Sequence, residues 1–327
     1  VVDRRFVLQR AEKEKFVELM RLYEEFCGVN VVTYCVMTNH FHLLIEVPPR
    51  PEEEMGDEEL IERLAKVYSP FYVEQVSTWL ATARAAGALD EVARLKEKFF
   101  YRMWDLSEFM KVLKQRFTQW FNKKHSRKGT LWESRFKSVL VEDGHAARVM
   151  SAYIDLNPVR AGMVDDPKSY RWCGYGEAVA GNQKALEGVV RVLESNEGDS
   201  GAVAQSLTPL ERMEQYRVLL FEDGELVESD SRSPVTRAKS NKKGMTPKQV
   251  AKVLESGGKL SQWQMLRCRI RYFSDGMVIG SKMFVDDFFV KNRESFSKGR
   301  KSGARKLRKI GGQRLHAIRD LQKRPVG

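Results

Sequence analysis

The feature that most constrains the fold is an apolar run at residues 30–47, NVVTYCVMTNHFHLLIEV. β-Branched and other apolar residues fill it on both sides of Thr38 and Asn39, a residue pair suited to a tight turn. The run therefore predicts two strands joined as a hairpin. Because residues two apart in a strand point to the same side, about 7 Å apart along the backbone, His40 and His42 share one face. The opposite face carries the apolar side chains of Phe41, Leu43, Ile45 and Val47.

Helical patterns flank this hairpin. Residues 11–27 place apolar side chains at three- and four-residue steps, which predicts an amphipathic helix closed by Gly28. Residues 106–124 show the same periodicity. Residues 136–143, FKSVLVED, predict a further strand, and residues 144–157 predict a further helix. The order helix, strand, strand, helix, strand, helix is that of an α+β sandwich lacking an initial strand.

The length of 327 residues is about twice that of a usual domain, so two modules are expected. A proline-rich, acidic break, PPRPEEEMGDEE, opens a helical insertion that we interpret as a lid or spacer. Composition predicts little core at residues 182–206 and a helix at residues 208–222. The expected organisation is a domain at 1–180 with its insertion at 51–104, a linker region with one helix at 181–245, a small, mainly helical module at 246–292, and a basic tail at 293–327 that is mobile when alone.

The net charge of +12 is unevenly distributed. Residues 291–327 contain 13 Lys and Arg against two acidic residues, or +11, and residues 111–137 contain nine against one, or +8. Such runs often form solvated faces, but two of them favour a polyanion as the partner. Aromatic residues interleaved with the second run offer bases a stacking surface, which favours nucleic acid. These aromatic residues are Trp120, Phe121, Trp132 and Phe136.

The cysteines give no sign of a zinc knuckle or a disulfide framework, because Cys27, Cys35, Cys173 and Cys268 show no CxxC spacing. Free thiols are typical of the reducing cytoplasm, which is the expected location. No apolar run is long enough for a membrane span and no signal peptide is visible, so no membrane partner is expected.

The two histidines suggest metal chemistry. Two neutral imidazoles on one strand face can hold a divalent cation and leave positions open for oxygen ligands and a substrate phosphate. Tyr153 and Asn157, within SAYIDLNPVR, are four residues apart and share a helix face. A phenol with a pKa of about 10 can attack phosphorus only if the charge on the phosphoryl oxygens is neutralised. A cation held by His40, His42 and the Asn157 oxygen would neutralise it.

Other interpretations of these four residues stay open. The histidines can be ordinary strand residues with hydrogen-bond partners, and Tyr153 can be a packed core aromatic. Asn157 can be the N-cap of a turn that starts with Pro158.

Three stretches resemble the single-tyrosine HUH transposases, whose motif is two His around a bulky hydrophobic residue. YCVMTNHFHLLIEV resembles that motif. GTLWESRFKSVLVEDG and YIDLNPVRAGMV resemble the two downstream motifs of the REP-associated tyrosine transposase branch. The similarity covers about residues 5–178.

The resemblance implies a ferredoxin-like HUH core with a Mg²⁺ or Mn²⁺ site and a tyrosine that attacks single-stranded DNA. His40 and His42 match the metal ligands, Asn157 the third ligand, and Tyr153 the nucleophile. The implied products are a 5′-phosphotyrosine and a free 3′-hydroxyl, and a second 3′-hydroxyl can reseal the strand without ATP. The implied target is a short imperfect hairpin, the REP palindrome, with a tetranucleotide at its foot.

The chain departs from that family in two respects. Only VVDRRFVLQR precedes the first predicted helix, so the sheet is expected to lack its opening strand. The insertion separates the histidine strand from the next helix, whereas these elements are closer in compact members. The spacing also leaves open whether Tyr153 acts on the metal of its own chain or on that of a partner in a homodimer.

Other candidate residues are assigned by their positions. His125 and His145 have no ligand spacing and are expected on the surface or the DNA side. Asp155 lies about 200° round the helix from Tyr153 and is expected to face solvent. Trp132 is a candidate base contact, although core packing is the favoured account. The candidate DNA-binding residues are Lys111, Lys114, Arg116, Lys123, Lys124, Arg127, Lys128, Trp132, Arg135 and Arg160.

Functions of different classes fit these features. The first is a metal-dependent single-strand DNA endonuclease and strand transferase acting on hairpin DNA, which the intact His40, His42 and Tyr153 favour. The second is a catalytically silent protein that binds hairpin DNA or RNA, which the missing opening strand favours. A third, a metal-dependent phosphodiesterase that uses water as the nucleophile, would leave Tyr153 dispensable.

Overall fold

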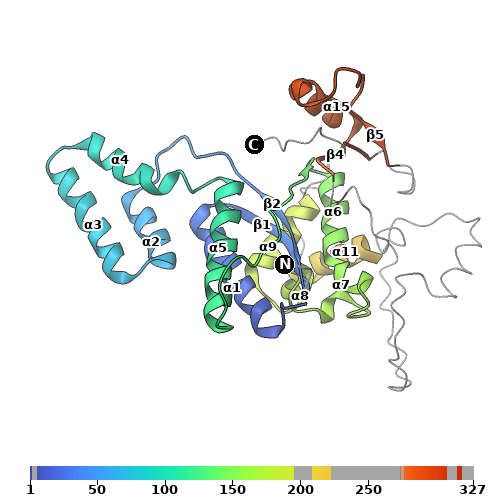
Figure 1. Cartoon of the computed structure of the whole chain (residues 1–327), viewed down its shortest axis with the longest axis horizontal. Coiled ribbons are helices and arrows are strands. Elements are labelled where there is room, and N and C mark those ends of the chain that lie inside the picture. The colour runs from blue at the N-terminus through green and yellow to red at the C-terminus, as the bar shows by residue number, and fades with distance from the viewer. Residues whose placement is uncertain (2–5, 195–207, 222–272, 274–275, 308–314, 319–327) are drawn as a thin grey trace, which may run out of the picture. The chain divides into compact units, whose positions relative to one another are not determined.

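The computed structural model describes residues 1, 6–194, 208–221, 273, 276–307 and 315–318. The described residues form a mixed α and β structure, in agreement with the predicted class (Figure 1). Two compact units divide the chain: unit 1 is residues 1–32 with 36–136, and unit 2 is residues 33–35 with 137–327. His40 and His42 belong to unit 1, and Tyr153 and Asn157 belong to unit 2.

The first helix is confirmed within one residue of its predicted ends. α1 (Arg10–Cys27) begins at a capping box, in which Gln9 and Glu12 each accept a hydrogen bond from the other's backbone N–H. It ends at Gly28, whose φ of 63° is the left-handed conformation that glycine adopts without steric cost. The buried apolar residues of α1 are Phe16, Leu19, Met20, Tyr23, Phe26 and Cys27.

The predicted hairpin is also confirmed. β1 (Asn30–Val36) and β2 (Phe41–Glu46) pair in a two-stranded sheet. The N–H of Met37 donates a 2.8 Å hydrogen bond to the carbonyl of His40, which closes the turn. His40 therefore lies at the end of the turn and His42 lies within β2.

The long helix after the insertion has the predicted bounds. α5 (Leu106–Lys124) is capped by Asp105, whose carboxylate accepts a 2.8 Å hydrogen bond from a first-turn N–H. Phe117 on α5 packs edge-on against Phe16 of α1, with ring centroids 5.4 Å apart. The ring of Phe41 lies 4.6 Å from that of Phe16. Aromatic side chains thus join α1, β2 and α5 in one core.

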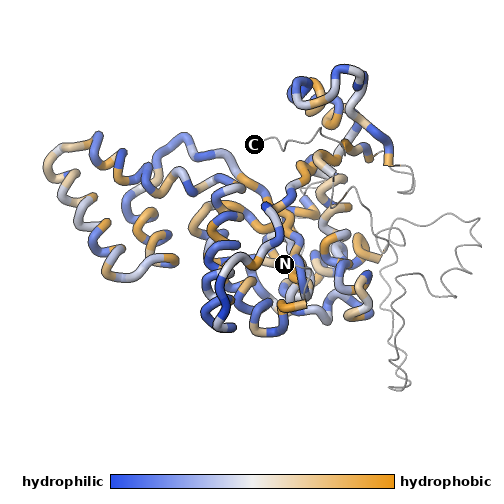
Figure 2. The backbone as a smooth tube through the Cα atoms, in the orientation of Figure 1, coloured by the Kyte–Doolittle hydropathy of each residue, from blue (hydrophilic) through white to orange (hydrophobic). Residues whose placement is uncertain are grey.

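The predicted insertion is helical and consists of α2 (Asp57–Val67), α3 (Pro70–Ala85) and α4 (Leu89–Phe100). α3 packs against both α2 and α4 (Figure 1). Hydrophobic and hydrophilic segments alternate along these helices (Figure 2), as expected where one side of each helix is buried. Ser69 caps α3 by accepting a hydrogen bond from the N–H of Tyr72.

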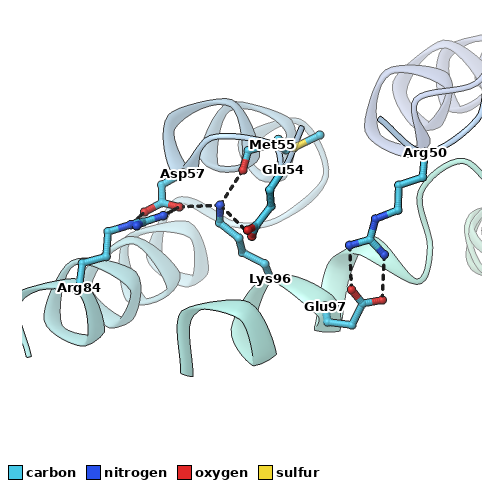
Figure 3. Close-up of polar contacts among 7 residues, drawn as sticks. All are labelled: Arg50, Glu54, Met55, Asp57, Arg84, Lys96 and Glu97. Atoms are coloured by element: carbon cyan, nitrogen blue, oxygen red, sulfur yellow. Dashed lines mark hydrogen bonds and ion pairs between the residues drawn. The ribbon is translucent and has the colours of Figure 1, made fainter. Parts of the chain in front are cut away.

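A buried lysine holds the three insertion helices together (Figure 3). Lys96 on α4 is 2% exposed, and its Nζ donates a 2.6 Å hydrogen bond to the carbonyl of Met55. The same Nζ lies 2.9 Å from an Asp57 oxygen and 3.3 Å from a Glu54 oxygen. Asp57 also pairs with Arg84 of α3, and hydrogen bonds from Arg84 and Lys96 lower the pKa of Asp57 to about 2. Asp57 is the acidic partner nearest to the buried Lys96 charge, so removing Asp57 would weaken the compensation of that charge most.

Unit 2 contains the predicted tyrosine helix and several helices that pack on it. In chain order these are α6 (His145–Asp155), α7 (Asn157–Arg160), the 3₁₀ turn η2 (Pro167–Ser169), α8 (Gly174–Val179), α9 (Gln183–Glu194) and α11 (Pro209–Phe221). α11 confirms the helix predicted at residues 208–222. The expectation of little core at residues 182–206 is wrong for α9, which packs on α6, α8 and α11. Its apolar residues are few, but they recur on one helix face and are buried: Ala185, Val189, Val192 and Leu193.

The C-terminal part differs from the expected helical module and tail. Its elements are β4 (Val278–Gly280), α15 (Lys282–Lys291), the 3₁₀ turn η3 (Arg293–Ser295), β5 (Arg305–Lys306) and β6 (His316–Ile318). Its hydrophobic core is Val278, Val285, Phe289, Phe296 and Ile318. Residues 296 and 318 lie within the segment expected to be a tail, so part of that segment is folded. The helix expected from residue 246 lies outside the described residues.

The strand at residues 140–141 pairs differently from the predicted sandwich. β3 (Leu140–Val141) pairs in parallel with β4, in a four-stranded sheet of order β3-β4-β6-β5. Of the predicted strand 136–143, Leu140 and Val141 alone pair with β4, so β3 is shorter than predicted. In the described part, the sheet of the histidine hairpin contains β1 and β2, and residues 6–9 before α1 form no strand.

Two expectations about membranes and thiols can be compared with the described residues. Among them, no helix is both long and apolar enough to cross a membrane. Cys27, Cys35 and Cys173 are buried and form no disulfide within the described part, and Cys268 lies outside it.

Candidate functional site

The two histidines share a face, as the strand period predicts. The ring centroids of His40 and His42 are 5.1 Å apart and the rings are perpendicular. His40 is exposed and His42 is half-buried. A metal-bound imidazole nitrogen lies about 2 Å from its ion, so two rings at this separation can turn their nitrogens to one cation.

A neighbouring amide orients the first ring. Nδ1 of His40 lies 2.6 Å from Oδ1 of Asn39. An amide oxygen can only accept a hydrogen bond, so Nδ1 carries the proton and donates. In the neutral ring, Nε2 then keeps its lone pair for a metal ion. Fixing the tautomer and orientation of a histidine ligand is the usual role of a residue that accepts its other ring N–H.

Two imidazoles alone do not complete a metal site. The described residues contain no group of three or more His, Cys, Asp or Glu side chains able to hold a metal ion. An amide oxygen such as that of Asn157, water and substrate phosphate are the remaining ligand types. The donor set therefore fits an ion that accepts both imidazole and oxygen, as Mn²⁺ does. His125 and His145 are exposed, as predicted, and His125 lies 3.1 Å from Glu12.

Tyr153 is packed between other side chains. The residue is 3% exposed and lies on α6, two residues from its end. The guanidinium carbon of Arg160 lies 3.8 Å from the centre of the Tyr153 ring, and Phe273 packs edge-on at 4.8 Å. Arg160 also donates a 2.7 Å hydrogen bond to the Tyr153 carbonyl. The interpretation of Tyr153 as a packed aromatic thus describes its ring in this conformation.

Asn157 is buried and does not cap α7. Its Nδ2 donates hydrogen bonds to the carbonyls of Tyr153 and Ile154, at 3.4 and 3.1 Å. The residue before α7 is Leu156, and no side chain caps that helix. The N-cap interpretation is therefore wrong, because the amide nitrogen turns back to the end of α6. Oδ1 is the atom of Asn157 that could bind an ion.

Asp155 is buried, so the expectation that it faces solvent is wrong. Its carboxylate accepts hydrogen bonds from Thr33 Oγ1 at 2.8 Å, from the Tyr216 hydroxyl at 2.6 Å and from the Tyr175 N–H at 3.2 Å. Burial, partly offset by these donors, raises the pKa of Asp155 to about 6. The side of α6 that carries Asp155 is covered, because Tyr216 of α11 contacts this carboxylate. Sequence reasoning missed Tyr216 because its helix lies in a segment interpreted as a linker.

The predicted DNA-binding cations of α5 and the following loop are mostly exposed. Those classed as exposed are Lys111, Arg116, Lys123, Lys124, Arg127, Lys128 and Arg135. Some of the cations also hold the fold. Nζ of Lys124 lies 2.7 Å from a Glu12 oxygen, and Nζ of the half-buried Lys114 donates a 2.9 Å hydrogen bond to the Ser134 carbonyl.

Trp132 packs in the aromatic core of unit 1. Its ring lies 5.4 Å from Phe41, 5.7 Å from Phe117 and 6.4 Å from Phe16. Its Nε1–H donates a 3.2 Å hydrogen bond to the Lys114 carbonyl. These contacts support the core-packing account of Trp132. The ring is half-buried, so part of it stays accessible.

Comparison with known proteins connects the histidine hairpin to a transposase family. Residues 1–78 match the family model described as "Transposase IS200 like". This match supports the transposase part of the predicted resemblance. It includes both histidines and ends before the helix that carries Tyr153. No curated protein and no solved structure matches the chain.

Proposed function

We propose that the chain is a metal-dependent single-strand DNA endonuclease and strand transferase with a ferredoxin-like HUH core. Its substrate is hairpin, REP-like DNA, and its intermediate is a covalent 5′-phosphotyrosine. The observation that carries the proposal is the pair of imidazoles of His40 and His42, whose ring centroids are 5.1 Å apart. The contact between Nδ1 of His40 and Oδ1 of Asn39 orients the first ring. The family match of residues 1–78 supports the same class of enzyme.

In this proposal His40 and His42, with Oδ1 of Asn157, would hold Mg²⁺ or Mn²⁺. The bound ion would neutralise the charge that develops on the phosphoryl oxygens. The phenol oxygen of Tyr153 attacks phosphorus, so a bond from that oxygen to phosphorus forms and the bond to the 3′ oxygen breaks. The phenol proton is released, and the 3′ oxygen leaves as a hydroxyl after taking up a proton. The phosphotyrosine remains a phosphodiester, so a 3′-hydroxyl can reverse the step.

The proposal requires the Tyr153 ring to become accessible. A cation–π contact contributes about 0.5–2 kcal/mol, whereas a charge-assisted bond from arginine to phosphate is bidentate and stronger. The approach of a DNA phosphate therefore favours transfer of the Arg160 guanidinium from the ring to the DNA. This transfer connects the two features of Arg160, its predicted DNA contact and its stacking on Tyr153.

A covalent-adduct assay tests the proposal. A hairpin oligonucleotide is labelled at its 3′ end, which stays on the fragment that a 5′-phosphotyrosine retains. It is incubated with the protein and Mn²⁺, then run on a denaturing gel. We expect a protein–DNA adduct that is lost in Tyr153→Phe, in His42→Ala and in EDTA. Tyr23→Phe is the matched control, because it removes a hydroxyl from a buried tyrosine of α1, outside the proposed site. If Tyr153→Phe still cleaves the oligonucleotide and no adduct forms, the nucleophile is water instead.

The second candidate is a catalytically silent protein that binds hairpin DNA or RNA. The burial of Tyr153 beneath Arg160 and Phe273 favours it. In that case the hairpin binds with the same affinity in wild type and Tyr153→Phe, and neither protein gives an adduct or a cleaved strand with Mn²⁺ or Mg²⁺.

A further inference from the structure

A hollow of about 380 Å³ opens on the solvent side of α5, within unit 1. One wall is the chain just after α4, at Tyr101 and Arg102. The floor is a stripe of α5 from Glu108 to Gln119 whose members recur every three or four residues. Because α5 has 3.6 residues per turn, such a stripe is one continuous face of the helix. The proposed catalytic residues are not part of this hollow.

The cations of the hollow are arranged by the protein. Arg102 is fixed by one hydrogen bond of 2.5 Å to the Tyr68 hydroxyl and by stacking over Phe26 at 5.0 Å. A guanidinium has five N–H groups, and this hydrogen bond to Tyr68 uses one of those of Arg102. Lys111 is held by the Glu108 carboxylate at 3.0 Å.

Arg116 is the cation of the hollow with the fewest contacts. It is exposed, and no ion pair or hydrogen bond of its guanidinium occurs within the described part of the chain. Together with Arg102 and Lys111 it gives three positive charges, against the single carboxylate of Glu108. The hollow therefore favours an anion with more than one oxygen, such as a phosphodiester.

The other groups of the hollow suit a base. Tyr101 is 56% exposed, although it is a large aromatic side chain next to the hollow. Gln115 and Gln119 lie one turn apart on the floor and are exposed, and neither amide has a hydrogen-bond partner among the described residues. A glutamine amide presents both donor and acceptor groups, which is the combination that reads a base edge. An aromatic ring is the group on which a base stacks.

We propose that this hollow binds one nucleotide of single-stranded DNA. Arg102, Lys111 and Arg116 hold its phosphates, its base stacks on Tyr101, and Gln115 and Gln119 contact the edge of that base. The volume lies in the range of sites for small ligands. The inference extends the proposed function, because it names a part of the DNA that is read away from the tyrosine and the metal. It depends on DNA binding and not on cleavage.

Binding without metal tests the phosphate contacts. Fluorescein-labelled 12-mers of deoxyadenosine, deoxycytidine and thymidine are titrated in EDTA at several salt concentrations, with fluorescence anisotropy as the readout. Arg116→Ala should reduce the slope of log K against log salt by about 0.7, the amount for one phosphate contact on a single strand. Lys98→Ala is the matched control, since Lys98 is an exposed cation of α4 outside the hollow. It should leave the slope unchanged.

Two further variants test the base contacts. Tyr101→Ala should weaken binding about fivefold or more, and Tyr101→Trp should restore it, because stacking needs an aromatic ring. Gln115→Ala combined with Gln119→Ala should bring the affinities for the three 12-mers closer together and leave the salt slope unchanged. A purely structural role of these residues would not change the ratio of affinities. Thermal unfolding of each variant checks that the fold is intact.

The outcomes separate this inference from the proposed function. Equal salt slopes for Arg116→Ala and Lys98→Ala, or an unchanged affinity in Tyr101→Ala, would overturn the hollow as a DNA site even if the adduct forms. If the wild-type protein gives no adduct but the variants show the expected changes in binding, the proposed nuclease activity is wrong and the hollow remains a DNA-binding site. Equal binding of the 12-mers of adenosine and deoxyadenosine would overturn the assignment to DNA in favour of any single strand.

Discussion

The histidine part and the tyrosine part of the candidate site are held in different ways. His40 is oriented by the residue before it, at a turn that is open to solvent. Tyr153 is covered by Arg160, seven residues away, and by Phe273, which is 120 residues away. A contact between adjacent residues thus orients the His40 ring, whereas side chains 7 and 120 residues away pack on the Tyr153 ring. If the proposed function is correct, the histidine part needs no rearrangement of His40 to bind metal, whereas the Tyr153 side chain has to become more accessible.

The largest expected effect concerns the distant contacts of the tyrosine helix. Asp155→Ala leaves the buried donors of Thr33 and Tyr175 without this acceptor, whereas the Tyr216 hydroxyl keeps its 2.5 Å contact with Ser151. Each unpaired donor costs about 1–3 kcal/mol, so the free energy of unfolding should fall by about 4 kcal/mol. Urea unfolding measures it. Glu214→Ala, which removes an exposed carboxylate from α11, should change it by less than about 0.5 kcal/mol. Equal losses in the two variants would show that Asp155 does not hold the tyrosine helix.

The pH dependence of stability is the next effect in size. The pKa of Asp155 is about 6 in the folded protein and about 3.9 in an unfolded chain. Between these values the folded state binds more protons, so the free energy of unfolding falls as pH rises from 4 to 6, by about 3 kcal/mol, and then levels off. Asparagine does not ionise, so the unfolding free energy of Asp155→Asn lacks this dependence on pH. The difference in unfolding free energy, wild type minus Asp155→Asn, should therefore fall over that range, and a difference that is constant with pH would contradict the raised pKa.

The smallest expected effect concerns the local contact of the histidine part. Asn39→Ala removes the acceptor that orients the His40 ring and should weaken Mn²⁺ binding about tenfold, as loss of an outer partner of a metal ligand does. Calorimetric titration of Mn²⁺ measures the affinity. Thr38→Ala, at the same turn, is the control and should bind Mn²⁺ as wild type does. Similar affinities in all three proteins would remove the claim that the histidine part is prepared in advance.

The features that could be predicted from the sequence are those set by local contacts, and the features that could not are set by distant contacts. The bounds of α1 and α5, the hairpin and the shared face of His40 and His42 were predicted, because each depends on periodicity and on neighbouring residues. The burial of Asp155 was not, since it depends on Tyr216, 61 residues later. The pairing of β3 with β4 joins residues 138 apart, and no local pattern encodes that partner. Lys96 is buried because Met55, Glu54 and Asp57 gather around it, a group that helical periodicity does not reveal.

The most direct test of the central claim is to identify the residue that carries the DNA after reaction with a hairpin oligonucleotide and Mn²⁺. The adduct is digested with protease and nuclease, and the modified peptide is sequenced by mass spectrometry. The account predicts one nucleotide linked through its 5′ phosphate to Tyr153, in a yield that falls to background in His40→Ala. A nucleotide on another residue, or a yield on Tyr153 that does not depend on His40, would contradict it.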